Sequence, residues 1–328
     1  MTAMLESWER RCAASSALRF LDINLRGIGQ VMFQNHPGTG LLFLAAITWG
    51  SYAGGMPQVA FGGLLGLVAA TQTAIALRVD RAGLAAGLYG YNGVLVGLAL
   101  PTFLAPSLLL WCYVLLGAAV SVVATLGTAN VTKTWRVAAL TFPFVLTTWL
   151  LLLAAHAFAG LDLASAGGDT EFLDPAETNP LDIAAFMAGV FKSISQVFLK
   201  GDAISALLLL AGLAVSSRAA AACALAGALL AVITAHLLGA ESALISAGLL
   251  GFSPVLTAIA LGSVFYQPAP RVLVYAALAT VFTVVVQGAV NVAVAPLGIP
   301  ALTFPFVLTS WLFLLPQQHF SPTTEAAS

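Results

Sequence analysis

The chain has 328 residues, of which 60% are hydrophobic and only 8% are charged, and its formal net charge is -1. Its mean hydropathy is +0.99, whereas soluble domains carry roughly 25% charged residues. This composition excludes an ordinary soluble domain, and the near-zero charge argues against a nucleic-acid partner. We therefore expect an all-α integral membrane protein.

The N-terminal segment, residues 1–15, is predicted to be a cytoplasmic lead-in. It lacks the ordered charged region, apolar core and small-residue cleavage site of a secretory signal. Arg10, Arg11 and Arg19 favour a cytoplasmic position for this end, because positive charge is retained on the inner side of a membrane.

The remainder of the chain contains an internal duplication. Shifting the sequence against itself by about 160 residues aligns three segments in the same order. The matches are GIGQVMFQN with SISQVFLKG (27–35 and 193–201), GYNGVLVGLAL with GFSPVLTAIAL (90–100 and 251–261), and LTFPFVLTTWL with LTFPFVLTSWL (140–150 and 302–312). We predict two homologous membrane repeats, residues 16–160 and 179–317, followed by a tail, residues 318–328.

An acidic linker, residues 161–178, separates the two repeats. It carries Asp and Glu residues but no Lys or Arg, so the positive-inside rule places it outside the cell membrane. A first repeat that begins inside and ends outside crosses the membrane an odd number of times. The second repeat then has inverted topology, which places a solute pathway at the repeat interface.

The apolar stretches allow about ten transmembrane helices, since about 20 apolar residues cross the hydrocarbon core. Two glycine-rich segments, residues 81–93 and 241–254, are too short to span and are predicted to be re-entrant half-helices. Irregular backbone at membrane depth occurs only where it is buried in protein or lines a cavity. The predicted architecture is therefore two inverted repeats around a central pore.

The repeated TFPF motif is the first candidate for the pore lining. A proline inside a helix leaves the carbonyl four residues earlier without its N–H partner, so Pro143 and Pro305 are expected to release carbonyl acceptors. Thr141 and Thr303 add hydroxyls beside them. The alternative is a kink packed in the core, with each threonine bonded to its own helix. Recurrence in both repeats favours the pore.

Two glutamines, Gln30 and Gln196, open the two repeats within QV dipeptides. A glutamine both donates and accepts hydrogen bonds and stays neutral, so it can hold an uncharged polar solute. The alternative is an interhelical hydrogen bond that stabilises packing. The symmetric pair favours a solute site.

Apolar side chains at helical spacing accompany these polar groups. They are Phe33, Tyr91, Leu95, Phe252 and Leu256, and such residues are more often core than site. Their position next to the expected half-helices favours a cavity wall. Leu199 stands where the first repeat has Phe33, so the two pore mouths are not expected to be identical.

Other chemistry is poorly represented. No phosphate-binding loop occurs, and few acids or bases lie in apolar segments, which argues against proton coupling. The scattered cysteines have no metal-ligand spacing, and we expect no cofactor or metal. An intramembrane enzyme using His156 or His236 as a base is the alternative of a different class, but neither histidine recurs in the other repeat. We expect no enzymatic activity.

Neutral acceptors between apolar walls suit a small, neutral, donor-rich solute, because a charged ion would not recover its hydration energy there. Urea, water, glycerol, ammonia and short amides all meet this description. Passive permeation is expected because no energy-coupling site is found.

The motifs resemble those of the urea transporter family. Its LPxxTxPF signature is similar to IPALTFPF (299–306) and, less closely, to VAALTFPF (137–144), and its GQV motif matches residues 29–31. The resemblance extends over about residues 18–315. It implies channel-like passage of urea down its gradient, with a channel for another small neutral solute as the alternative.

The resemblance also implies a homotrimer in a bacterial inner membrane, with one pore and two urea sites in each protomer. By motif, the pore residues would be Gln30, Phe33, Tyr91, Leu95, Thr141, Gln196, Val197, Phe252, Leu256 and Thr303. Family members commonly have phenylalanine at the position of Tyr91, so its hydroxyl is an addition without an assigned partner.

Overall fold

The computed structural model describes residues 2–158, 160–164 and 182–319. Most of the predicted acidic linker and of the predicted C-terminal tail therefore lies outside the described residues. Within the described ranges every regular element is helical, apart from one isolated antiparallel bridge between Leu104 and Leu163. The expected all-α class is confirmed.

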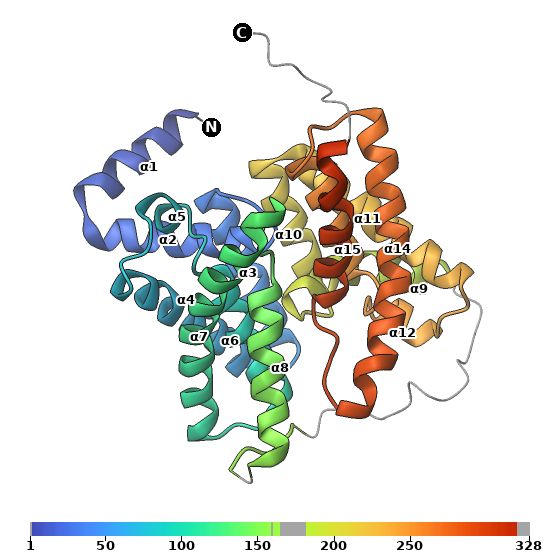
Figure 1. Cartoon of the computed structure of the whole chain (residues 1–328), viewed down its shortest axis with the longest axis horizontal. Helices are drawn as coiled ribbons and strands as arrows, with labels where there is room; N and C mark the ends of the chain where they lie inside the picture. Colours follow the sequence, from blue (N-terminus) through green and yellow to red (C-terminus); the bar gives the residue numbers. More distant parts are fainter. Residues whose placement is uncertain (1, 159, 165–181, 320–328) are drawn as a thin grey trace.

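The α-helices are arranged side by side with most long axes roughly vertical in Figure 1, while α1 lies at one edge. In chain order they are α1 (Thr2–Ala14), α2 (Ser16–Gln30), α3 (Pro37–Ala53), α4 (Pro57–Ala76), α5 (Arg81–Ala85), α6 (Tyr91–Phe103), α7 (Leu108–Thr132), α8 (Phe142–Ala157), α9 (Ile183–Ser195), α10 (Ala203–Ser216), α11 (Arg218–Leu237), α12 (Ser242–Ser246), α13 (Phe252–Ile259), α14 (Pro270–Val294) and α15 (Phe304–Leu314). Short turns of other helix types extend several of them: η1 (Lys133–Trp135), η3 (Gln196–Phe198), η5 (Ala295–Leu297) and η6 (Leu315–His319), and the π-helical η4 (Ala260–Val264).

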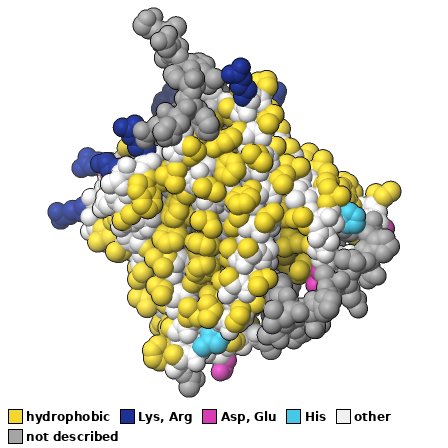
Figure 2. Space-filling view, turned by 45° about the vertical axis from the view of Figure 1, so that its right-hand side comes forward, with side chains coloured by type: hydrophobic (Ala, Val, Ile, Leu, Met, Phe, Trp, Pro, Cys, Tyr) yellow, Lys and Arg dark blue, Asp and Glu magenta, His cyan; other side chains and the backbone are white. Residues whose placement is uncertain are grey.

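The outer surface is apolar. Figure 2 shows hydrophobic side chains over most of one face, with Lys and Arg toward its upper and left edges and acidic groups toward the lower and right edges. Four helical stretches are long and apolar enough to cross a membrane: Pro57–Ala76, Leu108–Trp135, Arg218–Leu237 and Pro270–Leu297. A fifth forms if the pair Ile183–Phe198 and Ala203–Ser216, bent by 71°, is one span. The protein is therefore a multi-pass membrane protein, while the number of about ten crossings stays a prediction.

Glycines allow the closest helix contact. A Cβ at Gly97 of α6 would overlap the carbonyl of Gly62 in α4, and a Cβ at Gly66 would overlap the carbonyl of Gly93. Small residues let helix backbones approach in a membrane, where no hydrophobic force pulls helices together. The glycine content noted in the sequence thus places α6 inside the bundle, where ten of its residues are buried.

The lead-in predicted for residues 1–15 is mostly the helix α1, which is joined to α2 by polar contacts. Trp8 Nε1 donates to Asp22 Oδ1 at 2.6 Å. Asp22 also accepts from Arg26 Nε at 2.8 Å, and Arg26 reaches Glu9 at 3.6 Å. These contacts fix the direction of α1 relative to the membrane helices.

The element order before and after the linker corresponds. Helices α4 and α11 both have 20 residues, α5 and α12 both have 5, and α7 and α14 both have 25. Left-handed backbone recurs at matching places: Gly87 (φ 75°) and Gly248 (φ 75°), and Leu140 (φ 52°) and Leu302 (φ 51°). Two similar sequences therefore adopt similar local structure.

Two expectations about local structure are wrong. Pro143 and Pro305 do not kink a helix: each lies at the second position of a new helix, α8 or α15, where a missing N–H costs nothing. The carbonyls of Ala139 and Ala301 are not released either. Each accepts from an N–H three residues later, that of Phe142 or Phe304, at 3.3 Å.

The glycine-rich segments also differ from the expected half-helices. Each begins with a helix of only five residues, α5 or α12, which is followed by a turn through a glycine of positive φ. The last three residues of each segment already belong to the next helix, α6 or α13. The half-length apolar helices are the next elements, Tyr91–Phe103 and Phe252–Val264. The sequence predicted a half-length helix in each of these two regions, but it placed the start of that helix about ten residues too early in the chain.

Candidate functional site

The two repeated threonines meet in the centre of the molecule. Thr141 Oγ1 and Thr303 Oγ1 lie 2.7 Å apart and share a hydrogen bond, and each residue is 3% exposed. Both are the N-caps of helices that begin with Phe-Pro-Phe. The preceding leucines, Leu140 and Leu302, have left-handed backbone that turns the chain into these caps. Two residues that the sequence identified only as separate pore-lining candidates are thus in direct contact.

The repeated glutamines make matching hydrogen bonds. Gln30 Nε2 donates to the carbonyl of Ala86 at 2.9 Å, and Gln196 Nε2 donates to the carbonyl of Ala247 at 3.2 Å. Ala86 and Ala247 are the C-caps of the short helices α5 and α12. Each side-chain amide therefore donates one hydrogen bond to the protein. Among the described residues, the oxygen of each amide has no hydrogen-bond partner. Two amide oxygens are left as acceptors.

Tyr91 has a hydroxyl whose partner could not be assigned from the sequence. Its Oη donates to the carbonyl of Leu140 at 2.5 Å, directly before Thr141. The corresponding residue of the second repeat is Phe252, which has no hydroxyl. The two surroundings of the threonine pair are therefore chemically different.

Phe33 lies between aromatic rings of the second repeat. Its ring centroid is 5.8 Å from that of Phe265 and 6.1 Å from that of Phe306, both edge-on. Phe33 has positive φ (64°), and so has Leu199 (58°) at the matching place. The two repeats therefore present different side chains, Phe33 and Leu199, on the same backbone turn.

The remaining candidates are core residues in this structure. Leu95, Val197 and Leu256 are exposed by 1%, 2% and 0%, and Phe252 packs partly buried against the same apolar cluster. The structure joins Thr141 directly to Thr303, and it places the Tyr91 hydroxyl on the carbonyl of Leu140, the residue before Thr141. It also links Phe33 to the helix that Thr303 caps. It does not join the two glutamines to this centre by a hydrogen bond.

Sequence reasoning missed two tryptophans. Trp149 Nε1 donates to the carbonyl of Pro300 at 2.7 Å, and Trp311 Nε1 donates to the carbonyl of Ala138 at 2.8 Å. Each indole thus joins a helix of one repeat to the segment before the threonine of the other repeat. The available signal was the tryptophan at the same place in LTTWL and LTSWL.

A third missed residue is Lys200, which is only 4% exposed although it carries a charge. Its chain neighbour Gly201 lies near Gln196: a Cβ there would be 3.6 Å from Gln196 Nε2. The matching position in the first repeat is Gln34, which is neutral and 3% exposed. The second repeat therefore has a buried positive charge, Lys200, one residue before the glycine that lies near Gln196. The first repeat has no such charge near Gln30.

The histidines do not form a catalytic arrangement in the described part of the chain. His156 Nδ1 is 3.0 Å from the carbonyl of Leu152 in its own helix. No group of three or more His, Cys, Asp or Glu side chains in the described residues could hold a metal ion. The neutral polar groups around the threonine pair are therefore the better site.

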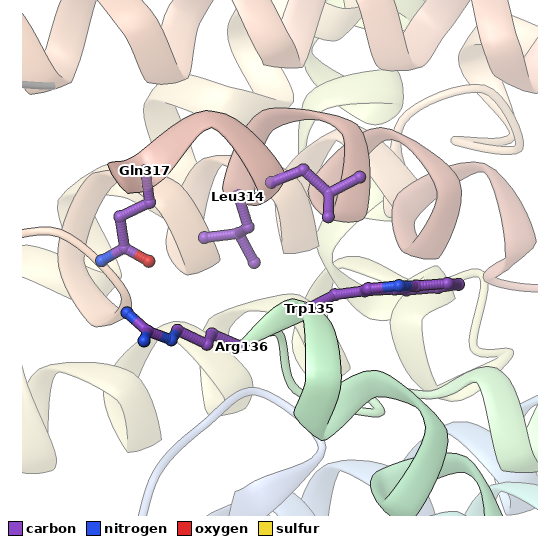
Figure 3. A pocket seen from close by; sticks show the side chains of 5 residues that line it. Trp135, Arg136, Leu314 and Gln317 are labelled. Carbon is purple, nitrogen blue, oxygen red and sulfur yellow. The ribbon is translucent and has the colours of Figure 1, made fainter. Parts of the chain in front are cut away.

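One cavity of the described residues lies elsewhere. It has a volume of about 300 Å³ and is lined by Trp135, Arg136, Leu314, Leu315 and Gln317. Figure 3 shows Arg136 and Gln317 facing each other across its opening, with the flat Trp135 ring below Leu314. None of the ten candidate residues lines it, so it is no part of the predicted pathway.

Comparison with known proteins supports a transporter. The family model described as "Urea transporter" matches residues 21–318. The chain is 28% identical over 302 residues to "Urea transporter 1" of Ovis aries, covering 91% of this chain and 77% of that protein. It is 29% identical over 304 residues to "Urea transporter 1" of Rattus norvegicus, with the same coverage. These relatives are named as transporters and not as enzymes, and the chain belongs to the urea transporter family.

Proposed function

We propose that the chain conducts urea passively through a pathway that passes the Thr141–Thr303 contact. The observation that carries this proposal is the meeting of two duplicated hydroxyls, 2.7 Å apart, in an otherwise apolar centre. Urea is the solute named for the relatives, and it is neutral, flat and rich in N–H donors. Hydroxyl and amide oxygens are the acceptors such a solute needs.

The threonine contact also sets a requirement for permeation. With the two hydroxyls bonded to each other, a solute passes between them only after they separate. A net hydrogen bond between neutral groups contributes about 1 kcal/mol, and N–H donors of the solute would replace it. The barrier is therefore low for a donor-rich solute and higher for an apolar one. No charged side chain is among the ten candidates, which supports passage of neutral molecules.

Inverted repeats are part of the proposal. In Figure 1 the chain runs in opposite directions along α7 and α14, and in opposite directions along α8 and α15. α8 and α15 match in sequence, and α7 and α14 correspond in order and length, so these directions support a second copy that is turned over relative to the first. An inverted pair places equivalent residues on opposite sides of a central point, which agrees with one threonine from each copy at the contact.

We further infer residence in a bacterial inner membrane with a cytoplasmic N-terminus, and assembly as a homotrimer with one pore in each protomer. The separation of basic and acidic side chains toward opposite edges supports one defined orientation. The trimer rests on the family resemblance alone. Cross-linking of the purified protein in lipid, resolved by mass, tests it: bands that stop at two copies would contradict a trimer.

Urea flux into proteoliposomes, followed by stopped-flow light scattering, tests the central proposal. Thr141→Val and Thr303→Val keep the side-chain volume and remove the hydroxyls. Each variant takes one hydrogen-bond acceptor from the solute at the barrier, so we expect urea flux to fall by up to about tenfold, the equivalent of about 1.4 kcal/mol. Thr102→Val is the matched control, because Thr102 bonds to the carbonyl of Leu98 in its own helix.

Unchanged urea flux in both threonine variants would remove the pathway assignment. Comparison of urea with water, ammonia and short amides in the same vesicles separates the leading proposal from a channel for another neutral solute. Flux of these solutes that exceeds urea flux would favour the alternative.

A further inference from the structure

The first repeat contains a buried hydrogen-bonded trio that fixes the start of α8. Asn92 Oδ1 accepts from the N–H of Phe144 at 3.3 Å, and Asn92 Nδ2 donates to Thr125 Oγ1 at 3.1 Å. Phe144 is the third residue of α8, so its N–H has no partner within the helix. One amide thus satisfies a helix end and a hydroxyl together. Asn92 directly follows Tyr91, and Phe144 lies three residues after Thr141.

The second repeat has different side chains at the same three places. Alignment of Tyr91 with Phe252 puts Ser253 at the position of Asn92. Gln287 takes the place of Thr125, because each lies seventeen residues after the first residue of a 25-residue helix. Phe306 is the third residue of α15, as Phe144 is of α8. A long and a short side chain have exchanged positions.

All three groups in the second repeat are buried and unpaired. Ser253 Oγ and Gln287 Oε1 have no hydrogen-bond partner among the described residues, and these residues are 0% and 1% exposed. The N–H of Phe306, a residue that is 0% exposed, also has no partner in the described part of the chain. An orphaned polar group at membrane depth is destabilising. Three at homologous places indicate one missing partner rather than three accidents.

Gln287 Nε2 donates to Asn291 Oδ1 at 3.0 Å, one turn along α14, so the glutamine amide follows its own helix. It does not occupy the place that the Asn92 amide has in the first repeat. Ser253 is two heavy atoms smaller than asparagine, which is about the space of one water molecule.

We propose that the second repeat binds one structural water molecule between Ser253, Gln287 and Phe306. The water accepts a hydrogen bond from the Phe306 N–H and donates to Gln287 Oε1 and Ser253 Oγ. Three bonds are the usual number for a buried water. It replaces the Asn92 amide and holds the start of α15, which presents Thr303 and packs Phe306 edge-on against Phe33. Ser253 and Gln287 are positioning residues, whatever solute the chain carries.

A structure of the full chain at a resolution that shows ordered water tests this proposal. We expect one solvent peak within hydrogen-bond distance of Ser253 Oγ and Gln287 Oε1, and none beside Asn92. The double variant Ser253→Asn with Gln287→Thr copies the first repeat and should lose the peak. The reciprocal variant Asn92→Ser with Thr125→Gln should gain one.

Two results would overturn the proposal. One is a wild-type structure without the peak, in which Ser253 bonds directly to Gln287. The other is a peak that persists in the double variant. Thermal unfolding adds a second readout if crystals or grids fail: Ser253→Ala should lower the melting temperature, and the double variant should restore it. An equal loss in both variants would contradict a shared role with the Asn92 trio.

Discussion

Trp149 donates its indole N–H to the carbonyl of Pro300, 2.7 Å away, and so ties the helix that Thr141 caps to the segment that leads to Thr303. Trp311 makes the reciprocal bond to Ala138 at 2.8 Å. Each indole also packs on a phenylalanine of the opposite TFPF motif, with ring centroids 5.1 Å apart for Trp149 and Phe304 and 5.3 Å for Trp311 and Phe142. The two tryptophans therefore stabilise the threonine contact from both helices.

Trp149→Phe should weaken the stabilisation of the threonine contact. The ring packing is largely kept, while the Pro300 carbonyl loses its donor, so we expect a loss of about 1 kcal/mol in the free energy of unfolding. Urea flux should fall as well, because the position of Thr303 is less well fixed. Trp135→Phe is the control: Trp135 is 51% exposed. Thermal unfolding and vesicle flux, measured on the same preparations, check both effects, and equal behaviour of the two variants would contradict them.

Tyr91→Phe tests the asymmetry between the two repeats. The variant removes the bond to the Leu140 carbonyl and makes the first repeat resemble the second, which has Phe252. We expect a stability loss of about 1 kcal/mol with urea conduction retained, since phenylalanine suffices at the matching place. Abolished flux with normal folding would show instead that the hydroxyl contacts the solute. Phe252→Tyr is the reciprocal variant.

The sequence predicted the class of fold because composition alone defines a membrane protein, and it identified Thr141 and Thr303 as pore candidates because their motif recurs in both repeats. It did not predict that the two hydroxyls contact each other, because the recurrence of a motif does not say which of its residues meet. The start of α8 could not be placed, because a proline is equally compatible with a kink and with the first turn of a helix. The deciding feature is Leu140, a non-glycine residue with positive φ, and no local sequence rule predicts that conformation.

The tertiary hydrogen bonds could not be predicted from the sequence for a different reason. The partners of Gln30, Tyr91 and Trp149 are backbone carbonyls, which every residue has, so no residue type marks them. Only the recurrence of the donor is visible in a sequence. The positions that recur, Gln and Trp, are therefore the ones that an inspection of repeats can find before a structure is known.

Gly97→Ala tests the contact between α6 and α4. A Cβ at this position overlaps the carbonyl of Gly62, and a rigid backbone cannot yield as a side chain would. Overpacking of this kind costs about 1–3 kcal/mol. Gly127→Ala is the matched control, because a Cβ there has no atom within 4 Å among the described residues. The difference in melting temperature between the two variants measures the contact, and no difference would mean that the helices separate freely.

Asp80 should make stability depend on acid pH. It lies in the turn before α5, accepts from Tyr89 Oη at 2.6 Å and from the Gly83 N–H at 2.5 Å, and these bonds lower its pKa below the ordinary value of 3.8. A lowered pKa in the folded state gives stability that is present above pH 3.8 and is lost as the pH falls through the folded value. Asp80→Asn should remove this part of the acid sensitivity, measured by thermal unfolding between about pH 2 and 6. An unchanged acid profile in the variant would contradict the assignment.

Thr148 and Ser310 occupy matching places in α8 and α15, are 0% exposed, and have hydroxyls without a hydrogen-bond partner in the described residues. Other buried threonines behave differently: Thr280, for example, bonds to the carbonyl four residues earlier at 2.7 Å. Replacing an unpaired buried hydroxyl by a methyl group of the same shape is nearly neutral or stabilising. Thr148→Val should therefore keep or raise the melting temperature, whereas Thr280→Val should lower it. A lower melting temperature for Thr148→Val would show that its hydroxyl does have a partner in the membrane. Thr148 lies about two turns after Thr141 on one helix face, so that partner is either the solute or a structural water. Urea flux in the same variant would separate the two, because only a contact with the solute changes the flux.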